Sequence, residues 1–349
     1  MQRDAATGVV PLVRRPTPLR IYSGMDRLPD SLLERINAFR ESRVLLTAIE
    51  LDVFTAVGQG ATAPEVSARL STDPRATEML LNALTAIGLL TKREGVFRNS
   101  TEAARWLDDT SPDSARAALM HVVNLWPSWS HLTECVRKGS CRPAKRRTHA
   151  ETEAFIAMMH CNARGRAPMV VEAVGVEGVR RVLDLGGGSG AYAIAFAQAS
   201  PDLQADILDL PPVLPIARRH IEAAGLVGRV RTLVGNIVQD SYGSGYDLVF
   251  ISAICHMLDP IENRAMLRKS CRALAPGGRV VVQDFILDPD KTSPRAAALF
   301  SLNMLVRTPA GASYSEPEYR SWLEEAGFEN VTRLYVPGPA GLMVARRPA

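Results

Sequence analysis

Four glycines lie within five positions of one short segment, where an apolar run ending on a carboxylate gives way to small residues. The segment from Val182 to Tyr192 reads Val-Leu-Asp-Leu-Gly-Gly-Gly-Ser-Gly-Ala-Tyr. Glycine lets the backbone turn sharply and approach a ligand where a Cβ would block it, and a helix starting there presents unpaired N–H groups. Asp184, just ahead of the turn, adds a fixed acceptor. The pattern predicts a cradle for a nucleotide-like ligand.

The glycine pattern alone leaves two classes of ligand open. Gly186, Gly188 and Ala191 satisfy the G-x-G-x-x-G/A pattern of dinucleotide sites, and Asp209 lies about the right distance downstream. A dinucleotide places its pyrophosphate at the helix N-terminus, where Asp184 would repel it, whereas a free amino group would be attracted. S-adenosylmethionine carries that ammonium group and no phosphate. We therefore expect S-adenosylmethionine, with an NAD-dependent oxidoreductase as the alternative.

Alternating strands and helices must position this turn. From residue 181 onward, apolar runs alternate with helical stretches, which predicts an α/β fold with a parallel, doubly wound, Rossmann-like sheet. The expected parallel strands are residues 181–185, 205–209, 230–234, 246–252 and 279–283. Residues 331–335 and 341–345 flank a Pro-Gly-Pro break, so the last two strands are expected to pair antiparallel at one edge.

Polar side chains stand at successive strand ends, which is the edge of such a sheet where ligands bind. Asp209 ends the second strand and could accept hydrogen bonds from ribose hydroxyls, or else cap the next helix. Asn236 follows the third strand and could face an adenine edge, or else serve as a turn residue. Ser252 and His256 follow the fourth strand, and Asp284 follows the fifth. Their regular placement indicates one site along this edge.

The first half of the chain reads mainly as helices. Residues 1–29 lack periodicity and are expected to form a flexible arm. Residues 30–108 combine helical spacing, a capping box at Thr62 and a short hairpin within residues 89–98, which predicts a mainly helical, winged-helix-like dimerisation domain. Residues 109–178 are interpreted as linker and acceptor-pocket helices, and residues 179–349 as the domain that binds S-adenosylmethionine.

A winged helix can also bind DNA, but the charge pattern disfavours that function. The net charge is only +4, and the expected recognition helix offers Arg75 alone against Asp73 and Glu78. A transcription factor that senses the donor is therefore the weaker alternative. We expect neither nucleic acid nor membrane as a partner.

Several further patterns bear on the compartment. The chain has no run of about 18 apolar residues and no signal-peptide core, so a cytoplasmic protein is expected. Its five cysteines include no C-x-x-C pair and are interpreted as reduced thiols. The basic residues within positions 142–147 are expected to lie in a solvated loop.

Several motifs together resemble one known family. The glycine motif at residues 183–190, Asp209-Leu210-Pro211, Cys255-His256, Pro276-Gly277-Gly278 and Ala326-Gly327-Phe328 are similar to those of S-adenosylmethionine-dependent small-molecule O-methyltransferases. These are class I methyltransferases with an N-terminal winged-helix dimerisation domain, and the resemblance runs from about residue 31 to the C-terminus. It implies a homodimer formed through that domain, a small-molecule acceptor, and S-adenosyl-L-homocysteine as product.

The resemblance also assigns a donor site. Asn236 stands where many members have an aspartate at the adenine, and the neighbouring Ile237 would pack on the ring. The residues expected to bind the cofactor are Asp184, Gly186, Gly188, Asp209, Leu210, Asn236, Ile237 and Ser252.

His256 matches the family's general base, and Asp284 matches a carboxylate that orients it. A neutral imidazole, with an ordinary pKa near 6.5, can take a proton from a phenol with a pKa near 10 as the oxygen attacks the sulfonium methyl. Holding oxygen, methyl carbon and sulfur in line should supply much of the remaining acceleration. No catalytic metal is expected, because His256 and Asp259 alone supply too few ligands.

The acceptor half departs from the family pattern. Ser313 replaces the second carboxylate, Ser252 replaces the lysine four residues before the histidine, and Met257-Leu258 replaces the usual Asp-Trp after it. Relatives on this scaffold include carbon methyltransferases and members that bind the donor while running other chemistry. We therefore expect methylation of a hydroxyl on a small, aromatic molecule, with C-methylation and then a donor-binding, non-methylating member as alternatives.

The acceptor pocket is less specified by motifs. The helices within residues 109–178 carry large apolar side chains, which either pack in a core or form soft apolar walls around a flat organic molecule. The residues expected to contact the acceptor are Trp126, Phe155, Met159, His160, Asn303, Met304 and Thr308.

Overall fold

The computed structural model describes residues 28–140 and 148–349. The chain divides into two compact units, Met1–Arg43 and Val44–Ala349. Most of the expected flexible arm lies outside the described residues, and so does the basic cluster within positions 142–147.

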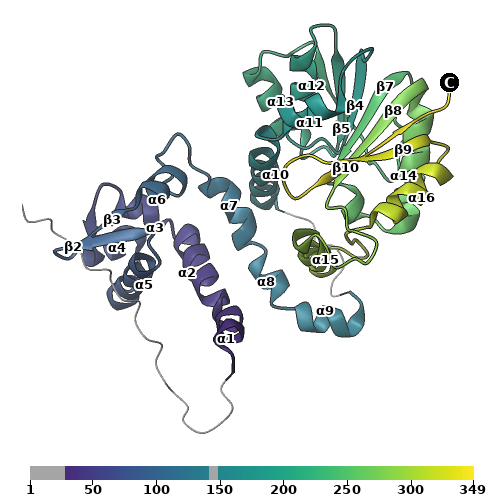
Figure 1. Cartoon of the computed structure of the whole chain (residues 1–349). Coiled ribbons are helices and arrows are strands. Elements are labelled where there is room, and N and C mark those ends of the chain that lie inside the picture. The colour runs from purple at the N-terminus through teal and green to yellow at the C-terminus, as the bar shows by residue number, and fades with distance from the viewer. Residues whose placement is uncertain (1–27, 141–147) are drawn as a thin grey trace, which may run out of the picture. The chain divides into compact units, whose positions relative to one another are not determined.

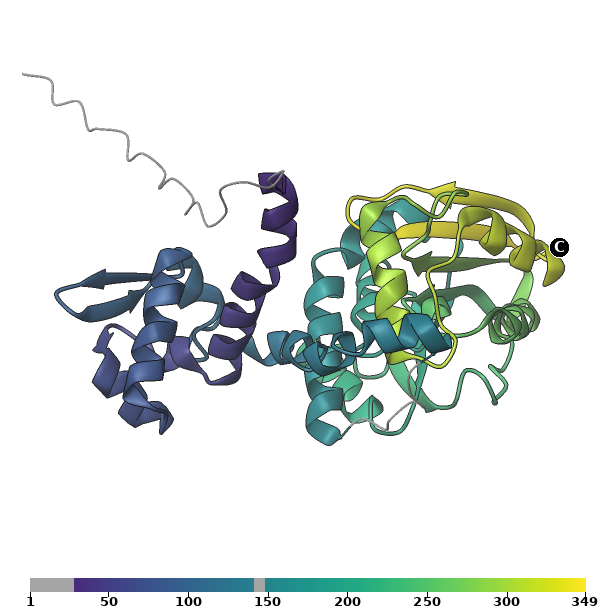
Figure 2. The same ribbon diagram turned by 90° about the horizontal axis from the view of Figure 1, so that it is seen from below.

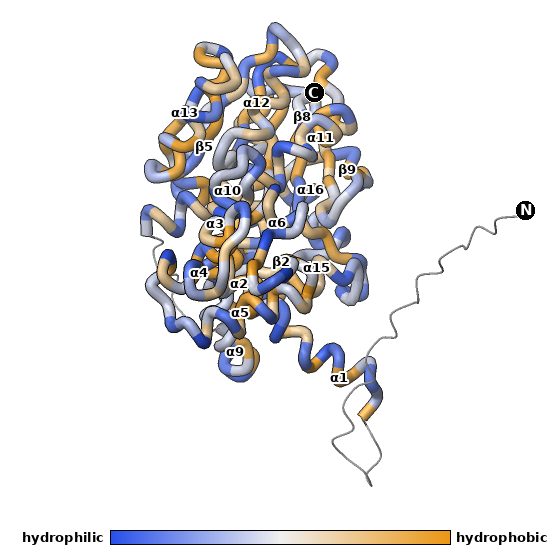
Figure 3. Tube along the Cα trace, turned by 90° about the vertical axis from the view of Figure 1, so that its left-hand side faces the viewer, coloured by the Kyte–Doolittle hydropathy of each residue, from blue (hydrophilic) through white to orange (hydrophobic). Residues whose placement is uncertain are grey.

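The described part of the first unit is helical. It comprises α1 (Asp30–Asn37) and the start of α2 (Phe39–Glu50). Figure 3 shows hydrophobic and hydrophilic residues alternating along α1. Leu32, Ile36 and Phe39 are 43%, 55% and 54% exposed, respectively. The amphipathic pattern predicted from the sequence is therefore present, and its large apolar side chains are exposed.

The second unit begins with short helices around a small antiparallel sheet of three strands in the order β1-β3-β2 (Figure 1). Its elements are α3 (Val53–Val57), β1 (Ala61–Thr62), α4 (Ala63–Leu70), α5 (Pro74–Ala86), β2 (Leu90–Arg93), β3 (Val96–Asn99) and α6 (Thr101–Trp106). Thr62 and Glu65 form the predicted capping box of α4, and the Asp73 side chain caps α5 by accepting from the Ala76 N–H. This is the helix, helix and wing order of a winged helix.

A run of helices leads from this region to the large sheet. It consists of α7 (Arg116–Val123), α8 (Trp126–Trp129), α9 (Leu132–Lys138), α10 (His149–Arg164) and α11 (Ala167–Val174). Thr148 and Glu151 form a capping box at the start of α10. Pro168 at the start of α11 fits there because that position needs no N–H donor.

The large sheet has seven strands in the order β6-β5-β4-β7-β8-β10-β9. The strands are β4 (Arg181–Leu185), β5 (Gln204–Asp209), β6 (Val230–Val234), β7 (Tyr246–Ser252), β8 (Leu274–Asp284), β9 (Glu329–Leu334) and β10 (Gly341–Arg346). The first five run parallel, while β10 is antiparallel to both β8 and β9. In Figure 2, β9 and β10 lie side by side in yellow. The predicted doubly wound sheet with an antiparallel edge is confirmed.

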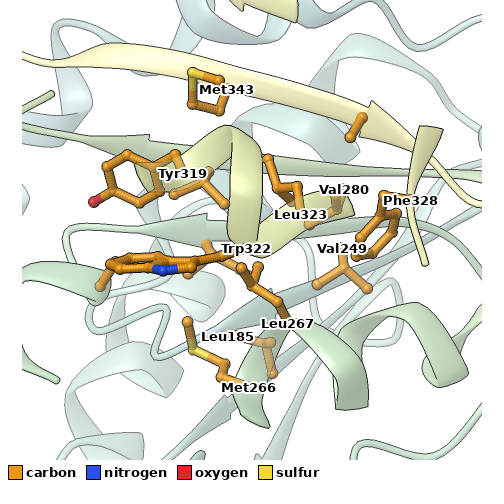
Figure 4. Packing of buried hydrophobic residues seen from close by; sticks show 14 of the residues in the cluster. Leu185, Val249, Met266, Leu267, Val280, Tyr319, Trp322, Leu323, Phe328 and Met343 are labelled. Carbon is orange, nitrogen blue, oxygen red and sulfur yellow. The ribbon is translucent and has the colours of Figure 1, made fainter. Parts of the chain in front are cut away.

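Helices cover both faces of this sheet (Figure 1). They are α11, α12 (Ala191–Ala199), α13 (Leu214–Ala223), α14 (Pro260–Ala273) and α16 (Glu316–Glu325). The short 3-10 helix η1 (Cys255–Met257) follows β7, and α15 (Arg295–Arg307) lies beyond the end of the sheet, next to η1, α8 and α9. Alternate residues of β7 enter different cores, as the two-residue period of a strand requires: Val249 packs under α14 and α16, and Phe250 under α11 to α13. In Figure 4, Trp322 and Leu323 lie over this first core.

Two further findings concern the cysteines and membrane spans. Cys135 is disulfide-bonded, whereas Cys161, Cys255 and Cys271 are free. The expectation of reduced thiols is therefore wrong at Cys135, because a disulfide depends on proximity in the fold and not on sequence spacing.

Among the residues that the structure describes, no helix is both long enough and apolar enough to cross a bilayer.

Candidate active site

The glycine turn joins β4 to α12 and needs glycine for two different reasons. Gly186, Gly188 and Gly190 have φ values of +65°, +59° and +78°, a region that side chains with a Cβ rarely adopt. At Gly187 the reason is close approach, because a Cβ there would lie 2.6 Å from Asp184 Oδ2. The turn therefore packs directly onto the carboxylate that precedes it.

Asp184 is buried beneath the turn, with 1% of its surface exposed. Neither carboxylate oxygen makes a hydrogen bond of good geometry within the part of the chain that the structure describes, although the Ala193 N–H lies close enough to lower the pKa of the carboxyl. Burial, with a smaller contribution from the nearby Asp209, raises the pKa of Asp184 to about 7. A positively charged group on the turn would stabilise the charged carboxylate, so the site suits a ligand that carries an ammonium.

Asp209, at the end of β5, holds the turn from the neighbouring strand. Its Oδ2 accepts from the Gly188 N–H at 2.9 Å, and its Oδ1 accepts from the Leu210 N–H at 2.7 Å. The next helix, α13, starts only at Leu214 and takes Val213 as its N-cap, so Asp209 does not cap it. Burial raises the pKa of the Asp209 carboxyl. Leu210 is 48% exposed beside it.

Asn236 and Ile237 form a tight turn after β6. The Asn236 side-chain oxygen accepts from the Val238 N–H at 2.9 Å, and the Asn236 N–H donates to Asp240 at 2.7 Å. Lys269 of α14 donates to the carbonyl oxygen of Ile237 at 2.6 Å. The side-chain oxygen of Asn236 therefore acts as a turn acceptor, one of the two roles predicted for this residue. Contact of Asn236 and Ile237 with adenine stays a prediction.

Beyond β7, the chain bends sharply and brings a histidine onto the sheet edge. Ser252 ends the strand half-buried, and Ala253 follows with a φ of +57°, its N–H donating to the Gln283 carbonyl at 2.9 Å. Asn263 of α14 donates to the carbonyl oxygens of Cys255 at 2.9 Å and Leu258 at 3.2 Å. These bonds fix the segment that carries His256.

His256 and Asp284 form a buried pair. Their exposed fractions are 6% and 2%. The distance from His256 Nδ1 to Asp284 Oδ1 is 2.6 Å, and the His256 backbone N–H donates to Asp284 Oδ2 at 3.1 Å. The carboxylate thus fixes both the ring and the backbone of the histidine. Because Nδ1 is engaged, Nε2 is the ring nitrogen left to accept a proton.

Two phenylalanines that sequence reasoning missed stand beside this pair. Phe300 of α15 meets the His256 ring edge to face at 4.8 Å, and Phe285 stacks on Phe300 at 4.0 Å. Phe300 lies one helical turn before Met304, a predicted acceptor residue, so helical spacing could have indicated it. The aromatic faces make an apolar setting next to the histidine.

The other predicted acceptor residues are held by several different elements. Asn303 Oδ1 accepts from Trp129 Nε1 at 3.0 Å, and Thr308 Oγ1 donates to the Met304 carbonyl at 2.9 Å. Met304 is buried and Met159 is half-buried. Trp126 packs against the core of the winged-helix region, and Phe155 meets His121 edge to face at 5.2 Å. Their contacts with an acceptor stay predictions.

His160 lies at the glycine turn. Its Nδ1 is 3.0 Å from Ser189 Oγ, and its ring stacks on that of His220 of α13 at 3.9 Å. Sequence reasoning named His160 but not these partners.

As for metals, the described residues contain no group of three or more His, Cys, Asp or Glu side chains that could hold an ion.

Comparisons with known proteins agree with this architecture. A family model for the O-methyltransferase domain matches residues 129–329, and one for the O-methyltransferase dimerisation domain matches residues 33–109. The chain is 36% identical over 326 residues to the 3-hydroxy-5-methyl-1-naphthoate 3-O-methyltransferase of Streptomyces sahachiroi, covering 90% of this chain and 94% of that protein. It is 32% identical to the L-tyrosine C(3)-methyltransferase of Streptomyces lavendulae, covering 87% and 88%.

A solved structure shows the same relationship. The human N-acetylserotonin methyltransferase in complex with S-adenosylmethionine superimposes with a TM-score of 0.81 at 25% identity, covering 94% of this chain and all of that one. The fold is that of a class I methyltransferase, and the cofactor is S-adenosylmethionine, so the alternative of a dinucleotide cofactor is excluded. The chain belongs to the O-methyltransferase family that carries an N-terminal dimerisation domain.

Proposed function

We propose that this methyltransferase transfers a methyl group to a hydroxyl of a small aromatic molecule, with His256 as the general base. The observation that carries the proposal is the buried contact of 2.6 Å between His256 Nδ1 and Asp284 Oδ1. A carboxylate in this position orients the imidazole and stabilises the cation formed when Nε2 takes a proton.

The chemistry follows from this pair. When bound, S-adenosylmethionine supplies an electrophilic methyl group on a positively charged sulfur. As the acceptor oxygen attacks, its proton moves to His256 Nε2, so a neutral hydroxyl becomes a nucleophile only while it reacts. Asp284 keeps its charge and balances the imidazolium. Phe300 and Phe285, packed beside the histidine, favour a flat aromatic acceptor and exclude water.

For the donor, the fit of the turn supports specific residues. Asp184 offers a buried carboxylate without a hydrogen bond of good geometry to the donor's ammonium, and Gly186 and Gly188 allow the backbone to come close. Asp209, at the end of the neighbouring strand, is proposed to accept hydrogen bonds from the ribose hydroxyls. Beyond it, the turn of Asn236 and Ile237 is proposed to receive the adenine.

C-methylation is the second candidate. The similar protein from Streptomyces lavendulae is named a tyrosine C(3)-methyltransferase, and Ser313 stands here in place of the family's second carboxylate. Next to a phenol hydroxyl, an aromatic ring carbon can attack the same methyl group while His256 removes the phenolic proton. The methylated carbon then loses its hydrogen as a proton and the oxygen takes a proton back, which restores the aromatic phenol. The two reactions differ in which acceptor atom is in line with the sulfur.

We also propose that the protein is a homodimer, in which residues 30–108 form the dimerisation domain. The dimerisation-domain match at residues 33–109 and the exposed apolar side chains Leu32, Ile36 and Phe39 support this. Residues 109–178 would then be linker and acceptor-pocket helices, and residues 179–349 the donor domain.

The test is a screen of phenols and other aromatic acceptors with a donor carrying a 13C-labelled methyl group. The chemical shift of the labelled product separates oxygen from carbon methylation. On the best acceptor, His256→Ala should lower kcat by about 10²- to 10⁴-fold, with binding of S-adenosylhomocysteine unchanged in calorimetry. Unchanged turnover in this variant would exclude His256 as the base.

A further inference from the structure

We propose that His160 is a positioning residue of the donor site, which ties the glycine turn to α10 and thereby sets donor affinity. The proposal rests on the assignment of the glycine turn to the donor and is independent of the acceptor or of His256. The contact that carries it is the 3.0 Å hydrogen bond between His160 Nδ1 and Ser189 Oγ.

Ser189 has a special place because it supplies the only side chain of the turn. Residues 186, 187, 188 and 190 are all glycine, so the rest of the protein can hold the turn only through its backbone or through Ser189. Asp209 holds the backbone at the Gly188 N–H, and His160 holds the Ser189 hydroxyl. Ser189 is 3% exposed and His160 is half-buried, so the hydrogen bond between them is partly shielded from water.

The His160 ring is itself fixed by α13. It stacks on His220 with ring centres 3.9 Å apart and an angle of 15° between the planes. One helical turn earlier on α10, Ile156 packs with Val213 and Ile216 beside the same helix. Ile156 also faces the turn, because a Cβ added to Gly188 would lie 3.7 Å from its Cδ1. One face of α10 therefore meets both the turn and α13.

Burial, more than the charges nearby, keeps His160 neutral. Burial, with smaller contributions from the neighbouring His220 and Arg164, lowers the pKa of His160 to about 4. Burial also lowers the pKa of His220, with Arg219 adding to the effect. Glu153 of α10 pairs with Arg219 of α13 at 2.8 Å. Near neutral pH the stack thus consists of two uncharged rings, which suits close contact.

The link has a consequence for the order of binding. The helix that holds Ser189 also carries Phe155 and Met159, two of the residues proposed to contact the acceptor. Fixing the turn around the donor should therefore fix the helix that bears part of the acceptor wall. We expect bound donor to slow hydrogen exchange along α10, and the acceptor to bind better after the donor.

The experiment measures the affinity of S-adenosylhomocysteine by calorimetry in His160→Phe, Ser189→Ala and the double variant. Phenylalanine keeps a ring to stack on His220 but has no ring nitrogen. Each single variant should weaken binding by about three- to tenfold, the worth of one buried hydrogen bond. The double variant should bind S-adenosylhomocysteine no more weakly than the single variant with the lower affinity. Losses that multiply in the double variant, or wild-type affinity in the single variants, would overturn the proposal.

Two further variants separate the hydrogen bond from packing. His160→Asn keeps a polar atom near the Nδ1 position and should retain most of the affinity, although it loses the stack. If His160→Asn binds weakly while His160→Phe binds normally, ring packing is what matters and the proposal is wrong. His149→Phe makes the same change at an exposed position in the first turn of α10 and should leave affinity unchanged.

Hydrogen exchange supplies the second readout. S-adenosylhomocysteine should protect α10 in the wild type and protect it less in His160→Phe, and equal protection in the two would contradict the link. Failure of the proposed O-methylation would leave all these binding results in place. A wild type that does not bind S-adenosylhomocysteine would overturn the donor site and this proposal together.

Discussion

Replacing Asp184 with asparagine should stabilise the free protein and weaken its hold on the donor. The carboxylate is buried and makes no hydrogen bond of good geometry, and its pKa of about 7 stands well above the ordinary 3.8 even though the nearby Ala193 N–H lowers it. That difference means that the charged form costs about 4 kcal/mol in the free protein. The asparagine amide is also buried without a partner, so we expect a net gain of about 1–3 kcal/mol at pH 8.

The sign of the pH dependence follows from proton linkage. Between the ordinary pKa and about 7, the folded protein keeps the Asp184 proton while the unfolded chain has released it. The contribution of Asp184 to the free energy of unfolding therefore falls as the pH rises through this window and is constant above it. The Asp184→Asn variant lacks this titrating group, so the gain from the substitution should be largest above pH 7.

Donor affinity should rise with pH, whereas the contribution of Asp184 to stability falls. If the bound ammonium requires the charged carboxylate, donor affinity follows the fraction of protein in which Asp184 is ionised. That fraction rises about eightfold from about pH 6 to about pH 7.5. Calorimetry with S-adenosylhomocysteine would show this rise in the wild type, together with proton release in buffers of different ionisation enthalpy. Asp184→Asn retains Asp209 and the ligand's own titration, so it serves as the control and should bind weakly with little pH dependence.

Two outcomes would refute this reasoning. One is a wild-type affinity that does not change across this pH range. The other is an Asp184→Asn variant that binds S-adenosylhomocysteine as tightly as the wild type while its free form is less stable. Either would show that Asp184 supports the turn structurally and does not respond to the charge of the donor.

Two further predictions concern stability. Gly187→Ala brings a Cβ within 2.6 Å of the Asp184 carboxylate. This variant should lower the free energy of unfolding by about 1–3 kcal/mol and weaken donor binding. Gly165→Ala, which has open space around the added Cβ, serves as the control and should leave both unchanged. The fully buried Tyr319 hydroxyl makes no hydrogen bond of good geometry, although it lies beside Asp284 and Cys255, so Tyr319→Phe should change stability by no more than about 1 kcal/mol. Tyr314→Phe loses a 2.6 Å hydrogen bond in the same core and should lower the free energy of unfolding. Denaturant titration of both variants would contradict this reasoning if Tyr319→Phe were the less stable of the two.

Most of the donor domain was predictable because local patterns specify it. The alternation of apolar strands with helices defined the parallel sheet, and the Pro-Gly-Pro break before the last strand indicated the antiparallel edge. Polar residues at strand ends pointed to one edge, where the structure joins Asp209 to the glycine turn and Asp284 to His256. In a parallel sheet, the order of strands brings such residues together without any further information.

What was not predictable depends on contacts between distant helices. His160 was predicted to contact the acceptor, and that stays a prediction; its contacts with Ser189 and His220 were not foreseen, because no local spacing encodes that packing. Phe300 was missed for a similar reason, because its position beside His256 depends on how α15 lies across the sheet edge. The disulfide at Cys135 likewise depends on distance in space.

The reversed strand β10 has a consequence for how the protein is made. Six residues near the C-terminus, Gly341–Arg346, fill the gap between β8 and β9, and the Arg347 N–H then donates to the Gly278 carbonyl at 2.8 Å. While the ribosome still holds these residues, β8 keeps one open edge and β9 has no neighbour. The sheet can therefore close only after residue 346 has left the ribosome, and a nascent chain stalled before residue 341 would expose a strand edge to chaperones or to aggregation.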